Sequence, residues 1–144
     1  MKKSSSIEFF TPKETNSSGI LFFDTGISAG FPSPADDFRE KRISLDEVLV
    51  KNKEATFFAK VKGQSMIDAG LDDEDLLVID RSLEPKNNKI AVCFLDGEFT
   101  VKRLRVEKQE VWLQPENPKY SPIKITEEND FVIWGIVTNV IKKV

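Results

Sequence analysis

The alternation of apolar and polar positions changes near residue 38. Before that point the chain is rich in Ser, Thr, Gly and Pro, and one apolar cluster stands out at Ile20–Phe23. Pro32 and Pro34 disfavour a regular helix and favour extended backbone. We therefore expect residues 1–38 to form an extended, partly disordered N-terminal arm, and residues 39–144 to form a folded domain.

Short helical segments are predicted at two places in the folded domain. Ser44 and Glu47 have the spacing of a capping box around the start of an apolar stretch, which predicts a helix of about two turns. Gly63 permits a sharp turn, and the residues from Ser65 to Gly70 then predict a second short helix or turn. A serine at the start of a helix usually caps it.

The rest of the domain has the pattern of short strands. Strands are predicted at residues 56–61, 76–80, 90–95, 98–104, 111–114 and 131–141. Asp96-Gly97 between two of them is a strong hairpin signal, and Gly135 indicates a bulge or a close backbone approach within the last. Many short strands separated by turn signals predict a mainly β fold of twisted antiparallel strands.

Composition and charge argue against several classes of function. The 144 residues carry a net charge of −3 with basic and acidic side chains intermixed, which argues against direct, specific DNA binding. Ile20–Phe23 is too short for the core of a signal peptide, and no apolar run reaches the length of a membrane span. We therefore expect a cytoplasmic protein without membrane contact.

Neither a metal nor a cofactor is expected. Cys93 is the single cysteine and the chain has no histidine, so no disulfide can form within the chain and the usual zinc ligands are missing. Cys93 lies in an apolar run, where a buried and unreactive thiol is typical. The acidic run 72–75 lacks the spacing of a calcium-binding loop and predicts a solvated turn.

The absence of histidine also limits hydrolytic chemistry. A serine nucleophile needs a base to accept its proton, and Ser-His-Asp catalysis is excluded in this chain. Lysine can take that role only when neutral, which requires its pKa of about 10.4 to fall by roughly three units through burial. The candidate pair is Ser65, in Gly63-Gln64-Ser65-Met66, and Lys102 on a predicted strand.

Local pattern alone leaves both residues with an ordinary interpretation. Lys102 fits an exposed position on the polar face of a hairpin, and Ser65 fits a helix cap. If Ser65 is instead a nucleophile, the backbone N–H groups of Gln64 and Ser65 are candidates for binding the oxyanion.

Three segments, in order along the chain, resemble the LexA/UmuD family of self-cleaving proteins. Residues 63–68, Gly-Gln-Ser-Met-Ile-Asp, resemble the nucleophile segment of that family, and residues 96–103, Asp-Gly-Glu-Phe-Thr-Val-Lys-Arg, resemble its lysine strand. Residues 29–35, Ala-Gly-Phe-Pro-Ser-Pro-Ala, resemble its self-cleavage segment, most closely in the UmuD-like branch. The hydrophobic run 131–140 is similar to the last strands of the family.

This resemblance implies a LexA/UmuD-like C-terminal peptidase fold and a role for each matched residue. Ser65 would be the nucleophile, and Lys102 would be the general base and then the acid that protonates the leaving amine. Ala29-Gly30 would be the scissile pair, although UmuD itself has Cys-Gly at that point and the repressors have Ala-Gly. Only 29 residues precede the cut, too few for the DNA-binding domain of a repressor, which favours the UmuD-like branch.

By the same resemblance, the chain would act in the SOS response to DNA damage. It would form a homodimer and cut itself when stimulated by the RecA filament on single-stranded DNA. It would then serve as the accessory subunit of a Y-family polymerase in error-prone translesion synthesis. Ile20–Phe23 lies roughly where UmuD-type arms carry an apolar patch that would contact the sliding clamp, unless it packs on the folded domain instead.

Two other functions stay open at the level of sequence. The chain can be a non-cleaving interaction or regulatory module of the DNA-damage response, in which the Ser-Lys dyad is vestigial. It can also be a transcriptional co-regulator of that response, a function that would require DNA binding.

Overall fold

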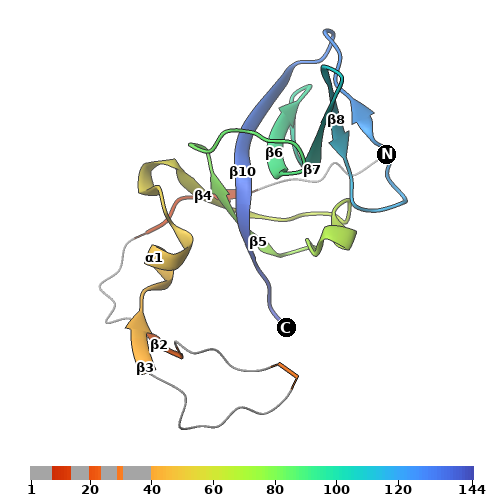
Figure 1. The fold of residues 1–144 in the computed structure, drawn as a ribbon. Helices are drawn as coiled ribbons and strands as arrows, with labels where there is room; N and C mark the ends of the chain where they lie inside the picture. Colours follow the sequence, from red (N-terminus) through yellow and green to blue (C-terminus); the bar gives the residue numbers. More distant parts are fainter. Residues whose placement is uncertain (1–7, 14–19, 24–28, 31–39) are drawn as a thin grey trace. The chain divides into compact units, whose positions relative to one another are not determined.

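A computed structural model describes residues 8–13, 20–23, 29–30 and 40–144 (Figure 1). By its internal contacts the chain divides into two units. Residues 8–12 and 52–144 belong to the first unit, and the described residues between 13 and 51 belong to the second.

The second unit contains one strand pair and one short helix. Strand β2 (Ile20–Phe23) pairs antiparallel with β3 (Glu40–Ile43), and helix α1 (Leu45–Leu49) follows. The predicted helix is therefore confirmed, but Ser44 makes no side-chain capping bond. Instead, the Ser44 carbonyl accepts a hydrogen bond from the Val48 N–H at 3.2 Å. Much of the predicted N-terminal arm lies outside the described residues.

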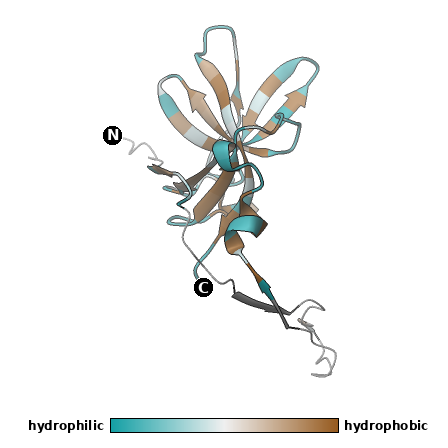
Figure 2. Cartoon of the chain, turned by 90° about the vertical axis from the view of Figure 1, so that its left-hand side faces the viewer, coloured by the Kyte–Doolittle hydropathy of each residue, from teal (hydrophilic) through white to brown (hydrophobic). Residues whose placement is uncertain are grey.

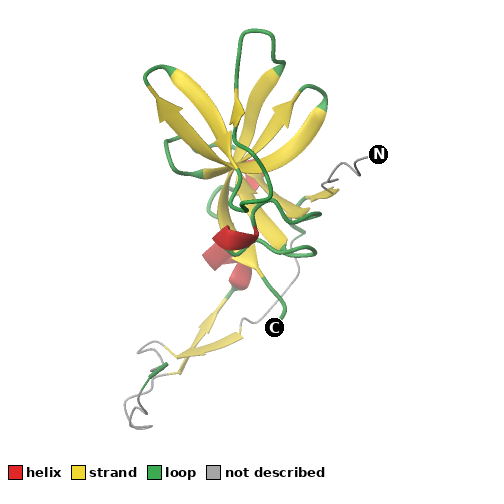
Figure 3. Ribbon diagram, turned by 90° about the vertical axis from the view of Figure 1, so that its right-hand side faces the viewer, coloured by secondary structure: helices red, strands yellow, loops and turns green. Residues whose placement is uncertain are grey.

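The first unit is built on one antiparallel sheet, in the strand order β1-β4-β5-β10-β6-β7-β8-β9. Its strands are β1 (Glu8–Phe10), β4 (Thr56–Lys60), β5 (Leu76–Asp80), β6 (Ile90–Leu95), β7 (Glu98–Glu107), β8 (Glu110–Gln114), β9 (Ile123–Lys124) and β10 (Phe131–Ile141). Two 3-10 turns, Lys53–Ala55 and Ile67–Ala69, interrupt this pattern. Figure 3 shows how strongly strands predominate over helix. The predicted mainly β, LexA/UmuD-like fold is confirmed.

Two turns between strands have backbone conformations with positive φ, and the sequence predicts only the first of them. Asp96 and Gly97 join β6 to β7 with φ of 48° and 90°, as the predicted hairpin turn requires. Lys108 and Gln109 make the next turn, also with positive φ of 47° and 67°. Because this second turn contains no glycine, its sequence gives no hairpin signal. Strand β7 accordingly ends at Glu107, later than predicted.

Gly135 confirms the predicted irregularity in β10. The pairing register of β10 with β6 shifts between Ile133 and Gly135. A Cβ at Gly135 would lie 2.6 Å from the Ile79 Cγ2 atom of neighbouring strand β5. The position therefore needs glycine because of close packing between strands.

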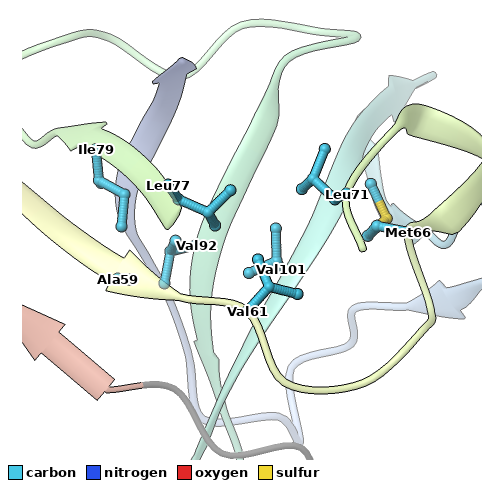
Figure 4. Packing of buried hydrophobic residues seen from close by; sticks show 8 residues of the cluster. All are labelled: Ala59, Val61, Met66, Leu71, Leu77, Ile79, Val92 and Val101. Atoms are coloured by element: carbon cyan, nitrogen blue, oxygen red, sulfur yellow. The ribbon is translucent and has the colours of Figure 1, made fainter. Parts of the chain in front are cut away.

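Two clusters of buried apolar side chains form the core of the first unit. One comprises Ala59, Val61, Met66, Leu71, Leu77, Ile79, Val92 and Val101 (Figure 4). The other comprises Ala91, Cys93, Leu104, Leu113 and Ile136. Successive residues of β6 alternate between the clusters, as side chains on a strand must. In Figure 2 the strands show hydrophobic stretches interrupted by hydrophilic bands.

The β1 strand makes residues 8–10 part of the first unit. It pairs antiparallel with β4, so Phe9 lies opposite Ala59. The Phe9 ring contacts Phe99 at a centroid distance of 4.9 Å and Trp134 at 4.6 Å. Sequence pattern gave no indication of this strand, because its pairing partner lies about fifty residues further along. Among the described residues, no helix is long and apolar enough to cross a membrane.

Candidate functional site

The segment around Ser65 is a tight loop that packs against the apolar core. Gly63 has a φ of 103°, which an L-residue rarely adopts. Met66 is 2% exposed and packs in the first apolar cluster with Leu71 (Figure 4). The 3-10 turn Ile67–Ala69 follows, and Gly70 ends it in the left-handed conformation.

Ser65 is not the cap of this turn, contrary to the ordinary interpretation of its position. Met66 occupies the capping position, and no side chain makes a capping bond there. The Ser65 hydroxyl is turned toward strand β7 instead, where its Oγ lies 3.0 Å from the Lys102 Nζ atom. The structure therefore brings the two candidate residues, 37 positions apart in sequence, into hydrogen-bond contact.

Lys102 is buried, with only 7% of its surface exposed. It lies opposite Ala91 on β6, and Leu104 on the same face is also buried. Besides Ser65, its Nζ contacts the Thr100 Oγ1 atom at 2.6 Å and the Val101 carbonyl oxygen at 3.1 Å. Two N–H groups of a neutral amine can donate to Thr100 and Val101, which leaves the nitrogen lone pair facing the Ser65 hydroxyl.

Burial lowers the pKa of Lys102 from 10.5 to about 8. Desolvation penalises the ammonium form, and within the described residues no carboxylate contacts this amine to restore it. A neutral amine at hydrogen-bond distance from a hydroxyl can accept its proton, so the geometry and the pKa together suit general-base chemistry. The nearby Cys93 thiol does not compete, because burial raises its pKa to about 12.

A small cleft of about 350 Å³, including its open mouth, lies beside Ser65. Its walls are mainly apolar and come from Val61, Met66, Leu71, Phe99 and Val101, and Thr100 adds a hydroxyl. Thr100 and Phe99 were not among the predicted site residues. Period-2 alternation would have found Thr100, since it lies two residues from Lys102 on the same strand face.

The other predicted site residues occupy distinct places. Gln64 is exposed and Ser65 is half-buried, and among the described residues neither backbone N–H donates a hydrogen bond. Ala29 and Gly30 are both exposed. They lie in the second unit, whereas Ser65 and Lys102 lie in the first.

The acidic run 72–75 forms the predicted turn, with Asp73 and Glu74 exposed, and it also supports the Ser65 loop. The Asp73 carboxylate accepts a hydrogen bond from the Gly63 N–H at 2.9 Å, and Glu74 forms an ion pair with Lys62. Asp72 and Asp75 form ion pairs with Lys142 after the last strand. Asp75 is only 6% exposed. These contacts cross long stretches of sequence, so the run alone could not reveal them.

Comparison with known proteins identifies the family of the chain. Residues 22–138 match the protein family described as Peptidase S24-like. The chain belongs to the Peptidase S24-like family. The predicted family membership is thereby confirmed, and the matched range, residues 22–138, spans the positions of Ala29-Gly30, Ser65 and Lys102.

The chain is also similar to several named proteins. The chain is 41% identical to Protein MucA of Salmonella typhimurium over 121 residues, which cover 83% of the chain and 82% of MucA. It is 43% identical to Protein SamA of the same organism over 115 residues, or 80% of the chain and 79% of SamA. A LexA repressor from Bordetella parapertussis is 37% identical over 81% of the chain, but only 53% of the repressor is covered.

Proposed function

We propose that this S24-like chain cleaves its own Ala29–Gly30 peptide bond with a Ser65–Lys102 dyad. The observation that carries the proposal is the 3.0 Å contact between Ser65 Oγ and a buried lysine amine whose pKa is about 8. The chain also contains a segment that resembles a family cleavage site, and both of its residues are exposed. The small apolar cleft beside Ser65 suits the methyl side chain of Ala29.

The reaction proceeds by acyl transfer. Lys102 Nζ takes the proton of Ser65 Oγ as that oxygen attacks the Ala29 carbonyl carbon, and the N–H groups of Gln64 and Ser65 stabilise the oxyanion. The bond between the Ala29 carbonyl carbon and the Gly30 nitrogen then breaks, and Lys102 returns the proton to the Gly30 amine. Water hydrolyses the Ala29 ester on Ser65, with Lys102 again as the base.

Incubation of the purified chain without any activator tests this proposal. At pH about 9.5 most Lys102 amines are neutral, so wild type should divide into two fragments. Ser65→Ala and Lys102→Met should remain whole. Ser82→Ala is a matched control, because the Ser82 hydroxyl bonds to Asp80 and is outside the cleft. Equal cleavage of Ser65→Ala and wild type would refute the role of Ser65.

The biological setting that we propose is the SOS response. Identity of 40% or more to MucA, ImpA and SamA proteins over at least 80% of the chain supports a UmuD-like role. In that role the chain forms a homodimer in the cytoplasm, and the RecA filament on single-stranded DNA stimulates its cleavage. The shortened product beginning at Gly30 joins a Y-family polymerase for translesion synthesis.

A RecA titration tests this setting separately from the chemistry. At pH 7.4, where only a minority of Lys102 amines are neutral, filaments on single-stranded DNA should accelerate cleavage, whereas RecA without DNA should not. If cleavage proceeds at pH 9.5 but filaments never accelerate it at pH 7.4, the peptidase chemistry stands and the SOS setting is wrong.

A further inference from the structure

The loop that follows strand β8 holds the Ser65 segment by three hydrogen bonds. The Glu116 N–H donates to the Ser65 carbonyl at 2.8 Å, and the Asp68 N–H donates to the Glu116 carbonyl at 2.7 Å. The third bond comes from a side chain, because the Asn117 Nδ2 amide donates to the Gln64 carbonyl at 2.8 Å. This loop lies about fifty residues beyond Ser65 in sequence.

The Asn117 bond has a directional consequence for the neighbouring N–H. The peptide between Gln64 and Ser65 is trans and planar, so its N–H points opposite to its C=O. Fixing the Gln64 carbonyl on the Asn117 side therefore fixes the Ser65 N–H on the other side. The Gln64 carbonyl also accepts a hydrogen bond from the Ile67 N–H, at a longer 3.3 Å, which holds it less firmly.

The loop is itself anchored, so Asn117 has a fixed position from which to act. Arg103, the residue after Lys102 on β7, forms an ion pair with Glu116 and donates to the Asn88 carbonyl at 2.7 Å. The Asn117 Oδ1 atom accepts a hydrogen bond from the Lys119 N–H at 3.0 Å. Strand β7 thus carries the lysine amine and, at the next residue, the anchor of the loop that holds the Ser65 peptide.

We propose that Asn117 is a positioning residue for the oxyanion donor of this peptidase. By holding the Gln64 carbonyl, it aims the Ser65 N–H at the oxygen that becomes negatively charged when Ser65 attacks a carbonyl. This inference rests on the proposed function of Ser65 as a nucleophile. It adds a residue whose side chain, among the described residues, hydrogen-bonds to Gln64 and Lys119 and not to Ser65 or Lys102.

Two substitutions test the hydrogen bond from the Asn117 side chain to the Gln64 carbonyl. Asn117→Asp keeps an oxygen to accept the Lys119 N–H but replaces the donor with an oxygen that repels the Gln64 carbonyl. Asn117→Ala removes both bonds without adding charge. Asn87→Asp is the matched control for charge, because the exposed Asn87 uses only its Oδ1, which accepts the Val106 N–H at 2.8 Å.

The first readout is the rate of self-cleavage between pH 6 and 10. Loss of a single oxyanion donor slows catalysis about 100- to 1000-fold, and misaiming one should slow it about 10- to 100-fold. Both Asn117 variants should show this loss at every pH, and the midpoint of the pH profile should stay at that of wild type because the surroundings of Lys102 are unchanged. Asn87→Asp should match wild type.

The second readout does not depend on self-cleavage. A fluorophosphonate probe forms an Oγ–P bond with Ser65 while the P–F bond breaks, fluoride leaves and Lys102 accepts the hydroxyl proton. The phosphoryl oxygen of the probe occupies the oxyanion position, so both Asn117 variants should react about 10- to 100-fold more slowly than wild type. Each protein is assayed well below its own thermal midpoint, so that unfolding does not contribute.

The outcomes separate this inference from the proposed function. Wild-type rates in both Asn117 variants, slowing in Asn117→Asp alone, or a shifted pH midpoint would overturn the positioning role. A wild-type chain that reacts with the probe but never cleaves itself refutes the proposed function, and slow probe reaction in both variants then still supports the role of Asn117. A wild-type chain that neither cleaves nor reacts overturns both.

Discussion

The buried position of Lys102 predicts how self-cleavage depends on pH. With a pKa of about 8, roughly 9% of the amines are neutral at pH 7 and roughly 90% at pH 9. The rate should therefore rise about tenfold between these two values and then level off. An unperturbed lysine would be about 0.03% neutral at pH 7, so burial raises the reactive fraction there by about 300-fold.

The cleavage rate rises with pH because only one protonation state of Lys102 is active. Lys102 accepts the Ser65 proton only as a free amine, so raising the pH increases activity until the amine is fully deprotonated. The assay is the first-order loss of intact chain, followed on denaturing gels between pH 6 and 10 without an activator. Ser65→Ala, run at each pH, measures and subtracts cleavage by contaminating proteases.

Two results would refute this reasoning. A rate that still rises tenfold per pH unit up to pH 10 would mean that Lys102 titrates like an exposed lysine. A rate that does not change between pH 6 and 10 would mean that no lysine of this pKa takes part. Either result would contradict the burial and the contacts that the structure gives to the amine.

Three further predictions follow from the same surroundings. Lys102→Met should raise the free energy of unfolding by up to about 3 kcal/mol at pH 6.5, because the pKa of the buried amine is lowered by roughly 2.5 units. Urea titrations should show this gain shrinking as the pH rises from 8 to 10.5, because deprotonation of Lys102 restores the stability of the wild-type chain over that range. Thr100→Val should slow cleavage about tenfold at pH 9, because the amine loses an orienting partner, while a thermal melt shows a stability change of only about 1 kcal/mol. Cys93, buried with a pKa near 12, should resist a thiol reagent at pH 8 in the folded chain and react in urea, and rapid reaction without urea would contradict its burial.

Local sequence signals predicted much of the fold. The hairpin at Asp96-Gly97, the strand Leu76–Asp80 and the irregularity at Gly135 depend on a few neighbouring residues, and the structure confirms all three. The turn at Lys108 and Gln109 escaped prediction because neither residue type usually favours positive φ.

Only those site residues that lie in a recognisable sequence motif could be predicted. The chemistry of a chain without histidine made Ser65 and Lys102 candidates, but only the resemblance favoured them over a cap and an exposed lysine. Burial of Lys102 results from packing of β6 and β7 against other strands, which no window of sequence contains. The bond from Asn117 to Gln64 spans 53 residues and depends on how the loop after β8 folds back.

The masses of the fragments formed at pH 9.5 test the central claim most directly. Cleavage by Ser65 at the proposed bond predicts two products, residues 1–29 ending in a free Ala29 carboxylate and residues 30–144 beginning with a free Gly30 amine. Both products should be absent from Ser65→Ala. Fragments cut at another bond, or the same two fragments from Ser65→Ala, would contradict the account.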